Sequence, residues 1–172
     1  MDIKEPRSQI DYMLRETRSQ LVNFSQMADI KANILLSISS VLTTIAIAKL
    51  TDPSWTLPVA ILVLFMLGAI FCALLAVIPS MRLLRPASKS ANDPEFNTLF
   101  FGDYALVSYE EYLAHMETVM NDPNRLYEVQ VREIYSAGKY LQNTKFNYIK
   151  YGYLLFFIGL LSSVVIYLIQ SM

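Results

Sequence analysis

The sequence predicts an all-α membrane protein with three transmembrane helices, the first and third continuous with long cytoplasmic stalk helices, plus a small helical cytoplasmic insert. Of the 172 residues, 54% are hydrophobic, which exceeds the usual share in a soluble domain. The excess lies in three runs, 32–48, 55–81 and 151–169. At ~1.5 Å per residue, each run crosses most or all of a ~30 Å hydrocarbon layer. No stretch shows the alternation of a half-buried strand.

The distribution of basic residues predicts the orientation of these spans. Lysines and arginines precede the first run, follow the second and precede the third, whereas the link at 51–54 has none. By the positive-inside rule, the N-terminus is cytoplasmic and the C-terminus lies outside. A cleaved signal peptide is not expected, because roughly thirty polar residues precede the first run and two more runs follow.

These observations divide the chain into seven predicted segments. They are a cytoplasmic amphipathic helix (1–31), transmembrane helix 1 (32–50), an outer loop (51–54), transmembrane helix 2 (55–81), a cytoplasmic segment (82–150), transmembrane helix 3 (151–169) and an outer tail (170–172). The cytoplasmic segment contains a linker, an aromatic turn, a short helix and the second stalk. Trp55, Tyr148, Tyr151 and Tyr153 lie where aromatic anchors of the membrane interface are expected.

The first stalk is predicted to enter the membrane as one unbroken helix, since the chain has no Pro or Gly between Pro6 and Leu50. Its apolar seam is Ile10, Leu14, Thr17, Leu21, Phe24 and Ala28. Asp29 and Lys31 follow, where this helix leaves water. We expect Lys31 to extend toward lipid phosphates and Asp29 to pair with a base on a neighbouring helix, and we predict both as coupling residues between the stalk and the membrane.

The second stalk is predicted to begin at Pro123, with Asp122 as its N-cap. No proline follows, and an apolar seam continues into the third span: Tyr127, Val131, Ile134, Gly138, Leu141, Lys145, Tyr148 and Gly152. Before it, Ser108 and Glu111 form a capping box that opens the short helix.

Polar and small residues mark packing faces within the spans. Asn33, Ser37, Ser40 and Thr44 form a polar stripe on one face of the first span. Two small-residue ridges, which favour close helix packing, are Gly68, Cys72 and Ala76 on the second span and Gly152, Gly159 and Ser163 on the third. The stripe is consistent with packing inside one chain or between copies, or with a water-lined path through an oligomer.

The sequence shows no pattern typical of catalysis or metal binding. It has no Gly-rich phosphate loop and no nucleophile elbow, and its one histidine, His115, has no second metal ligand beside it. The single cysteine, Cys72, excludes an intramolecular disulfide. A formal net charge of -1 argues against a generally basic binder of nucleic acid polymers. We therefore predict no enzyme activity, no cofactor and no metal.

The aromatic segment "FNTLFFGDYALVSYEEY" (96–112) has two interpretations. It is a hydrophobic plug with a tight turn at Gly102, or its aromatic rings stack on a nucleobase at about 1–3 kcal/mol per base. In the second case a phosphate would meet Arg82, Arg85, Lys89, Arg125 or Arg132. These basic residues can equally set the orientation of the chain in the membrane, by the positive-inside rule, or bind lipid headgroups.

The stretches "ADIKANILL" and "FFGDYALVSYEEY", in this order of spans, resemble the membrane effectors of the Pycsar anti-phage systems, the PycTM family. The resemblance implies that a bacterial uridylate or cytidylate cyclase makes cyclic CMP or cyclic UMP on infection. It also implies that this inner-membrane effector responds by impairing the membrane, giving abortive infection. The sequence has no cyclic-nucleotide-binding β-roll, so the ligand site must be built by residues 84–146 and the stalks.

The resemblance and the residues together predict a ligand site at Phe100, Phe101, Tyr104, Arg125 and Arg132, formed within one chain or across a homo-oligomer. Arg125 and Arg132 lie seven residues apart and hence close to one helical face. The alternative is a constitutive membrane anchor or adaptor subunit for a soluble partner. A passive channel or transporter subunit has less support, because the spans carry no central charge and no inverted repeat.

Overall fold

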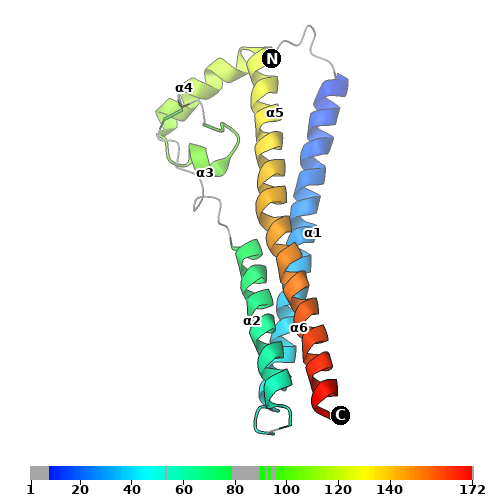
Figure 1. Cartoon of the computed structure of the whole chain (residues 1–172). Coiled ribbons are helices and arrows are strands. Elements are labelled where there is room, and N and C mark those ends of the chain that lie inside the picture. The colour runs from blue at the N-terminus through cyan, green and yellow to red at the C-terminus, as the bar shows by residue number, and fades with distance from the viewer. Residues whose placement is uncertain (1–7, 53, 79–89, 92, 94–95, 172) are drawn as a thin grey trace. The chain divides into compact units, whose positions relative to one another are not determined.

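The computed structural model describes residues 8–52, 54–78, 90–91, 93 and 96–171, and within them every regular element is helical, which confirms the predicted class (Figure 1). The elements are α1 (Ser8–Ile47), α2 (Thr56–Val77), α3 (Phe101–Tyr104), α4 (Tyr109–Met120), α5 (Pro123–Tyr140), a π-helical segment η1 (Leu141–Phe146) and α6 (Asn147–Ser171). Arg82, Arg85, Lys89 and the predicted end of the second span at 79–81 lie outside the described residues.

Three of these helical stretches are long and apolar enough to cross a membrane: Ser8–Ile47, Thr56–Val77 and Pro123–Ser171. The chain forms two compact units. We call Met1–Asn23 with Pro79–Tyr140 the head unit, and Phe24–Ile78 with Leu141–Met172 the membrane unit. Helix α1 contributes residues to both, as does the continuous run of α5, η1 and α6.

Helix α1 is uninterrupted for 40 residues, as the absence of Pro and Gly predicts. Its buried side includes Leu14, Ala28 and Leu35. Phe24, which we expected in the seam, is 47% exposed, and the half-buried Ser25 occupies the inward position. The reason is electrostatic: the Ser25 hydroxyl accepts a hydrogen bond from Lys145 at 3.0 Å.

In the membrane unit, α2 packs along α6 (Figure 1). Small residues lie at this contact. Ala69 and Ala73 form a core with Leu35 of α1. Gly68 and Cys72 face α6, where an added Cβ on Gly152 would lie 3.2 Å from the Cβ of Cys72. Small residues therefore line two adjoining faces of α2, because close approach replaces the hydrophobic drive that lipid does not provide.

The second long helix is not α-helical throughout. The six residues Leu141–Phe146 are π-helical, so the buried position moves from Thr144 to Ile149, five residues later. We expected Tyr148 in that seam, and it is only partly buried. Lys145, which the predicted seam already includes, lies in this π-helical segment and donates to Asp29 of α1.

Both predicted helix starts in the head unit are present, with one difference. The Asp122 carboxylate accepts hydrogen bonds from the backbone N–H groups of Asn124 (2.9 Å) and Arg125 (3.4 Å). The Ser108 hydroxyl accepts from the N–H of Glu111 at 3.2 Å. The Glu111 carboxylate, however, accepts from the Ser90 hydroxyl at 2.6 Å and the Ala91 N–H at 2.7 Å, so it anchors the chain before the aromatic segment.

Candidate ligand site

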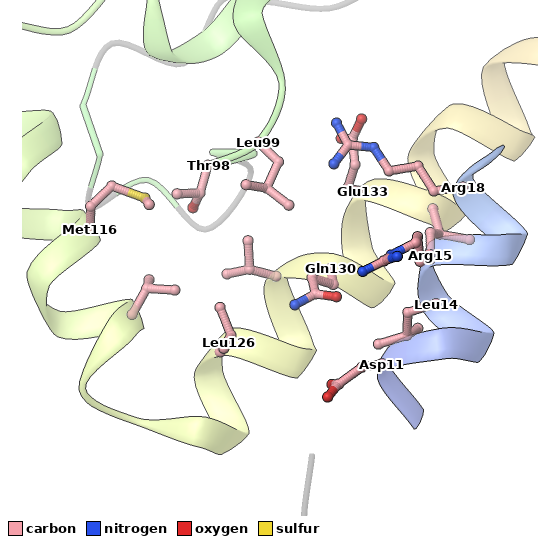
Figure 2. Close-up of a pocket in the computed structure, with 13 residues that line it drawn as sticks. Asp11, Leu14, Arg15, Arg18, Thr98, Leu99, Met116, Leu126, Gln130 and Glu133 are labelled. Atoms are coloured by element: carbon pink, nitrogen blue, oxygen red, sulfur yellow. The ribbon is translucent and has the colours of Figure 1, made fainter. Parts of the chain in front are cut away.

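A cavity of about 420 Å³ lies within the head unit, between α1, α4, α5 and residues 98–99 (Figure 2). Its volume falls within the ~300–1,000 Å³ range of small-molecule sites. The polar lining residues are Asp11, Arg15, Arg18, Thr98, Gln130 and Glu133. The apolar ones are Leu14, Leu99, Met116, Val119, Leu126, Val129 and Ile134.

Helical periodicity brings these side chains to one space. Asp11, Arg15 and Arg18 follow α1 at intervals of four and three, so they share a face. On α5, Gln130 lines the cavity, whereas Val131, which we expected in the seam, is 38% exposed. The seam prediction was wrong at this position: Gln130 and not Val131 faces the cavity, whose lining is partly polar.

The wall at residues 97–99 is fixed by Asn97, which is 2% exposed. Its side-chain amide donates to Glu133 Oε2 at 2.6 Å, and its Oδ1 accepts from the N–H of Leu99 at 3.2 Å. Its own N–H donates to Asp103 Oδ2 at 2.9 Å. Because hydrogen bonds to these partners offset the cost of burying the Asn97 polar groups, the network holds the segment in place.

His115 supports the same wall from α4. Its Nε2 lies 2.9 Å from the Thr98 hydroxyl, and its ring packs edge-on against Phe96. Burial lowers the pKa of His115, and the nearby charge of Arg125 lowers this pKa further, while Glu111 opposes the shift. The neutral imidazole is therefore favoured, and its Nε2 can accept a hydrogen bond from the Thr98 hydroxyl.

Tyr127 connects α5 to α1 within the head unit. Its ring is buried at 3% exposure, and its hydroxyl donates to Asp11 Oδ1 at 2.7 Å. A hydrogen bond to a charged acceptor stabilises by about 1.5–3 kcal/mol, so this contact fixes one end of the cavity. Asp11 and Glu133 are thus held by neutral donors, and within the described residues neither carboxylate forms an ion pair with an arginine.

The arginines that the structure describes in the head unit fall into two groups. Arg125 lies 3.7 Å from Asp122, and Arg132 lies 3.7 Å from Glu128 and donates to the carbonyl of Phe96 at 3.4 Å. Among the residues that the structure describes, neither Arg15 nor Arg18 forms an ion pair. Among the described arginines of the head unit, the two without a carboxylate partner are the ones that line the cavity.

The residues that we predicted as ligand contacts lie in the head unit, but none of the five lines this cavity. Phe100 packs against Phe101, which is 55% exposed, and Tyr104 packs against Tyr112. An added Cβ on Gly102 would collide with the Phe100 ring, so this glycine allows the turn to close. The predicted ligand set, with Phe100, Phe101 and Tyr104 in or beside α3 and Arg125 and Arg132 on α5, remains a prediction.

Sequence reasoning missed Arg15, Arg18, Asn97 and Gln130. The available signal was the spacing of Arg15 and Arg18, three apart and beside the apolar position Leu14. Asn97 offered none, because its partners Asp103 and Glu133 lie 6 and 36 residues away.

The predicted coupling residues lie in the membrane unit. Asp29 Oδ1 and Oδ2 accept hydrogen bonds from Lys145 Nζ at 2.7 and 2.8 Å. This contact agrees with the expectation that Asp29 pairs with a base on another helix. The side chain of Lys31 is exposed, and its backbone carbonyl accepts a hydrogen bond from the Tyr153 hydroxyl at 3.2 Å.

These features define a membrane protein with three helices, among the described residues, that are long and apolar enough to span a bilayer, and with a helical head unit that contains a cavity of ligand size. The family model described as the Pycsar effector protein domain, PycTM, matches residues 13–170. The chain therefore belongs to the PycTM family of effectors in anti-phage defence, as its resemblance to that family predicted. PycTM is an effector domain and not a known enzyme family. Neither the curated proteins nor the solved structures contain a match to this chain.

Proposed function

We propose that this Pycsar effector responds to cyclic CMP or cyclic UMP by impairing the integrity of the bacterial inner membrane, which gives abortive infection. The observation that carries the proposal is the combination, in one chain of this family, of three membrane-crossing helices with a ligand-sized head cavity that has two arginines without carboxylate partners. The ligand would come from a uridylate or cytidylate cyclase. The protein would act without catalysis, cofactor or metal.

The head unit is the proposed sensor. The head unit offers two candidate sites for the nucleotide: the surface predicted from the sequence, with Phe100, Phe101, Tyr104, Arg125 and Arg132, and the cavity lined by Arg15 and Arg18. A change in stalk packing would then pass along α1 and along α5, η1 and α6, since both helical runs contain residues of the head and of the membrane unit. Asp29 and Lys31 are the proposed coupling residues at this transition.

We further propose that the effector is a homo-oligomer. The polar stripe Asn33, Ser37, Ser40 and Thr44 is exposed in the single chain. The Thr44 hydroxyl donates to the carbonyl of Ser40 at 3.0 Å, but the Asn33 amide has no hydrogen bond within the described residues. An unsatisfied amide in hydrocarbon is costly, and the same stripe on a second copy offers both donors and acceptors.

The proposed topology places the N-terminus in the cytoplasm and the C-terminus in the periplasm. The charge asymmetry supports it, and so does the stacking of Trp55 on Tyr167 at 4.1 Å, since both rings lie at the predicted outer edge of the spans. Reporter fusions after Ser90 and after Met172 should localise to opposite sides of the membrane. Localisation of both reporters to the same side would contradict this topology.

Membrane potential in living cells tests the function itself. Cells that express the chain should depolarise when a membrane-permeant form of cyclic CMP or cyclic UMP is supplied, and they should keep their potential with cyclic AMP. A constitutive anchor or adaptor for a soluble partner, the alternative function, should leave the potential unchanged with every nucleotide. An unchanged potential with both pyrimidine nucleotides, in cells with verified membrane insertion, would favour the adaptor.

A further inference from the structure

The cavity of the head unit carries a distinctive set of charges. Arg15 and Arg18 extend from α1, three residues apart on one face, toward the space that Gln130 enters from α5 (Figure 2). Guanidinium groups bind phosphate oxygens through paired N–H donors, so two of them on one helix face suit a single phosphate. No described carboxylate competes for them by forming an ion pair.

The two carboxylates of the cavity limit how much negative charge a ligand can bring. Asp11 and Glu133 are held in place by Tyr127 and Asn97, which are neutral donors. The formal charges of the four charged lining residues therefore sum to zero. A site with no net charge does not strongly attract polyanions. A ligand with one negative charge can be held by the arginines, whereas each further charge meets the field of the carboxylates.

The remaining lining offers apolar surface and one amide. Leu126, Val119 and Met116 can cover the face of a small ring. Gln130 has both donors and an acceptor, so it can bind the polar edge of such a ring.

We propose that this cavity is the ligand site, and that it selects a nucleotide with a cyclic phosphodiester, bearing one charge, over its linear 5′-monophosphate. Arg15 and Arg18 hold the phosphate, and Asp11 and Glu133 repel the second charge. A phosphomonoester carries about −1.5 to −2 charges at pH 7, so the discrimination is electrostatic. The proposal rests on the proposed function in one respect, that the chain senses a pyrimidine mononucleotide, and it replaces Arg125 and Arg132 as the phosphate ligands.

Calorimetry on the full chain in zwitterionic nanodiscs tests this assignment with cyclic CMP, cyclic UMP, 5′-CMP and inorganic phosphate as probes. Wild-type protein should bind at least one cyclic nucleotide at least tenfold more tightly than 5′-CMP or phosphate. Replacing Arg15 and Arg18 with Ala should weaken that binding at least tenfold. The matched control, Arg125→Ala with Arg132→Ala, removes the same number of charges outside the cavity. It should change the affinity for the cyclic nucleotide less than threefold.

Two milder variants separate binding from folding. Arg15→Lys with Arg18→Lys keeps both charges and should retain part of the binding. Glu133→Gln keeps an oxygen that can accept from Asn97 but removes a negative charge, so 5′-CMP should bind more tightly relative to the cyclic form.

The possible results separate an error in the proposed site from an error in the proposed function. If wild-type protein binds a cyclic nucleotide and the Arg15, Arg18 double variant binds it equally well, this site is wrong and direct sensing stands. Loss of binding in the Arg125, Arg132 control alone would instead support the surface predicted from the sequence. Absence of binding by wild-type protein at millimolar concentration overturns both direct sensing and the site. Equal binding of phosphate and cyclic nucleotide would refute the proposed selectivity.

Discussion

Lys145 Nζ lies 2.7 Å from Asp29 Oδ1 and 2.8 Å from Asp29 Oδ2, and it also donates to the Ser25 hydroxyl at 3.0 Å. The Lys145 side chain is only 12% exposed, and that of Asp29 is 39% exposed. The lysine reaches this position from the π-helical segment. An ion pair therefore joins α1 to the second long helix within the membrane unit, near the predicted cytoplasmic edge of the bilayer.

Breaking this pair should destabilise the membrane unit. Asp29→Ala leaves a mostly buried ammonium group without its partner, and we expect a loss of roughly 1–3 kcal/mol, less than the ~3–5 kcal/mol of a fully buried pair because Asp29 is partly solvated. Thermal denaturation of the detergent-solubilised protein measures this loss of stability. The double variant Asp29→Asn, Lys145→Met should lose less stability than the sum of the losses in its two single variants, since no unpaired charge remains.

Lys31→Ala separates coupling from stability. The Lys31 side chain is exposed, and its contact with Tyr153 uses the backbone carbonyl, so stability should change by no more than ~0.5 kcal/mol. Both Lys31→Ala and Asp29→Ala should insert normally and give weaker phage protection. Full protection by the Asp29→Ala, Lys31→Ala double variant would show that neither residue couples the two units.

The polar stripe of α1 should be required for self-association. Asn33→Leu with Ser37→Ala removes side chains that lipid cannot satisfy, and we expect a loss of ~0.6–2 kcal/mol per interhelical hydrogen bond. Subunit counting by single-molecule photobleaching in membranes measures the change. Ile38→Ala, on a neighbouring exposed face, is the control and should leave the count unchanged. An unaltered count in the Asn33, Ser37 variant would argue for a different interface.

Gly159 should tolerate no side chain. An added Cβ would lie 2.5 Å from the Cβ of Phe65, an atom fixed by the α2 backbone, so Gly159→Ala should separate α2 from α6 and cost about 1–3 kcal/mol. Gly68→Ala is the matched control: its Cβ would lie 3.2 Å from the tip of Leu155, a flexible side chain that can shift. Thermal melts of the two variants should differ clearly. Equal melting temperatures would contradict the close packing of α2 on α6.

The head unit should lose stability as the pH falls. Burial lowers the pKa of His115 below its usual 6.5, so the unfolded chain binds the proton more readily, and the stability that the neutral ring provides is lost as the pH falls from 6.5 through the folded-state pKa. Hydrogen bonds from Ser90 and Ala91 lower the pKa of the Glu111 carboxyl below 4.5, which adds a loss of the same sign at lower pH.

Hydrogen exchange across residues 96–120, corrected for the intrinsic pH dependence of amide exchange, measures this loss. Protection should decline from pH 7 to pH 4. His115→Gln should remove the part of the decline near pH 6, and Glu111→Gln the part near pH 4. A flat protection profile in wild-type protein would contradict the hydrogen-bonding roles of both groups.

Local chemistry was sufficient to predict the helices and their starts. Apolar runs of span length, the absence of Pro and Gly before Leu50, and the Asp122–Pro123 pair are all contained in contiguous residues, and each acts on its own backbone. Membrane class and helical class followed from them, since an apolar segment of this length satisfies its backbone only as a helix in lipid. The charge of Asp29 beside an apolar span also predicted a basic partner, although not which one.

Tertiary structure alone decided where the polar side chains meet. Lys145, which the predicted seam placed on the inward face, pairs with Asp29, 116 residues away, and after the π-helical turn Ile149 is buried where Tyr148 was expected. The head cavity depends on Asn97 reaching Glu133 and on Tyr127 reaching Asp11. Such contacts depend on how helices approach one another in space, which a helical period along one segment does not encode, and so the sequence pointed to Arg125 and Arg132 while the cavity formed around Arg15 and Arg18.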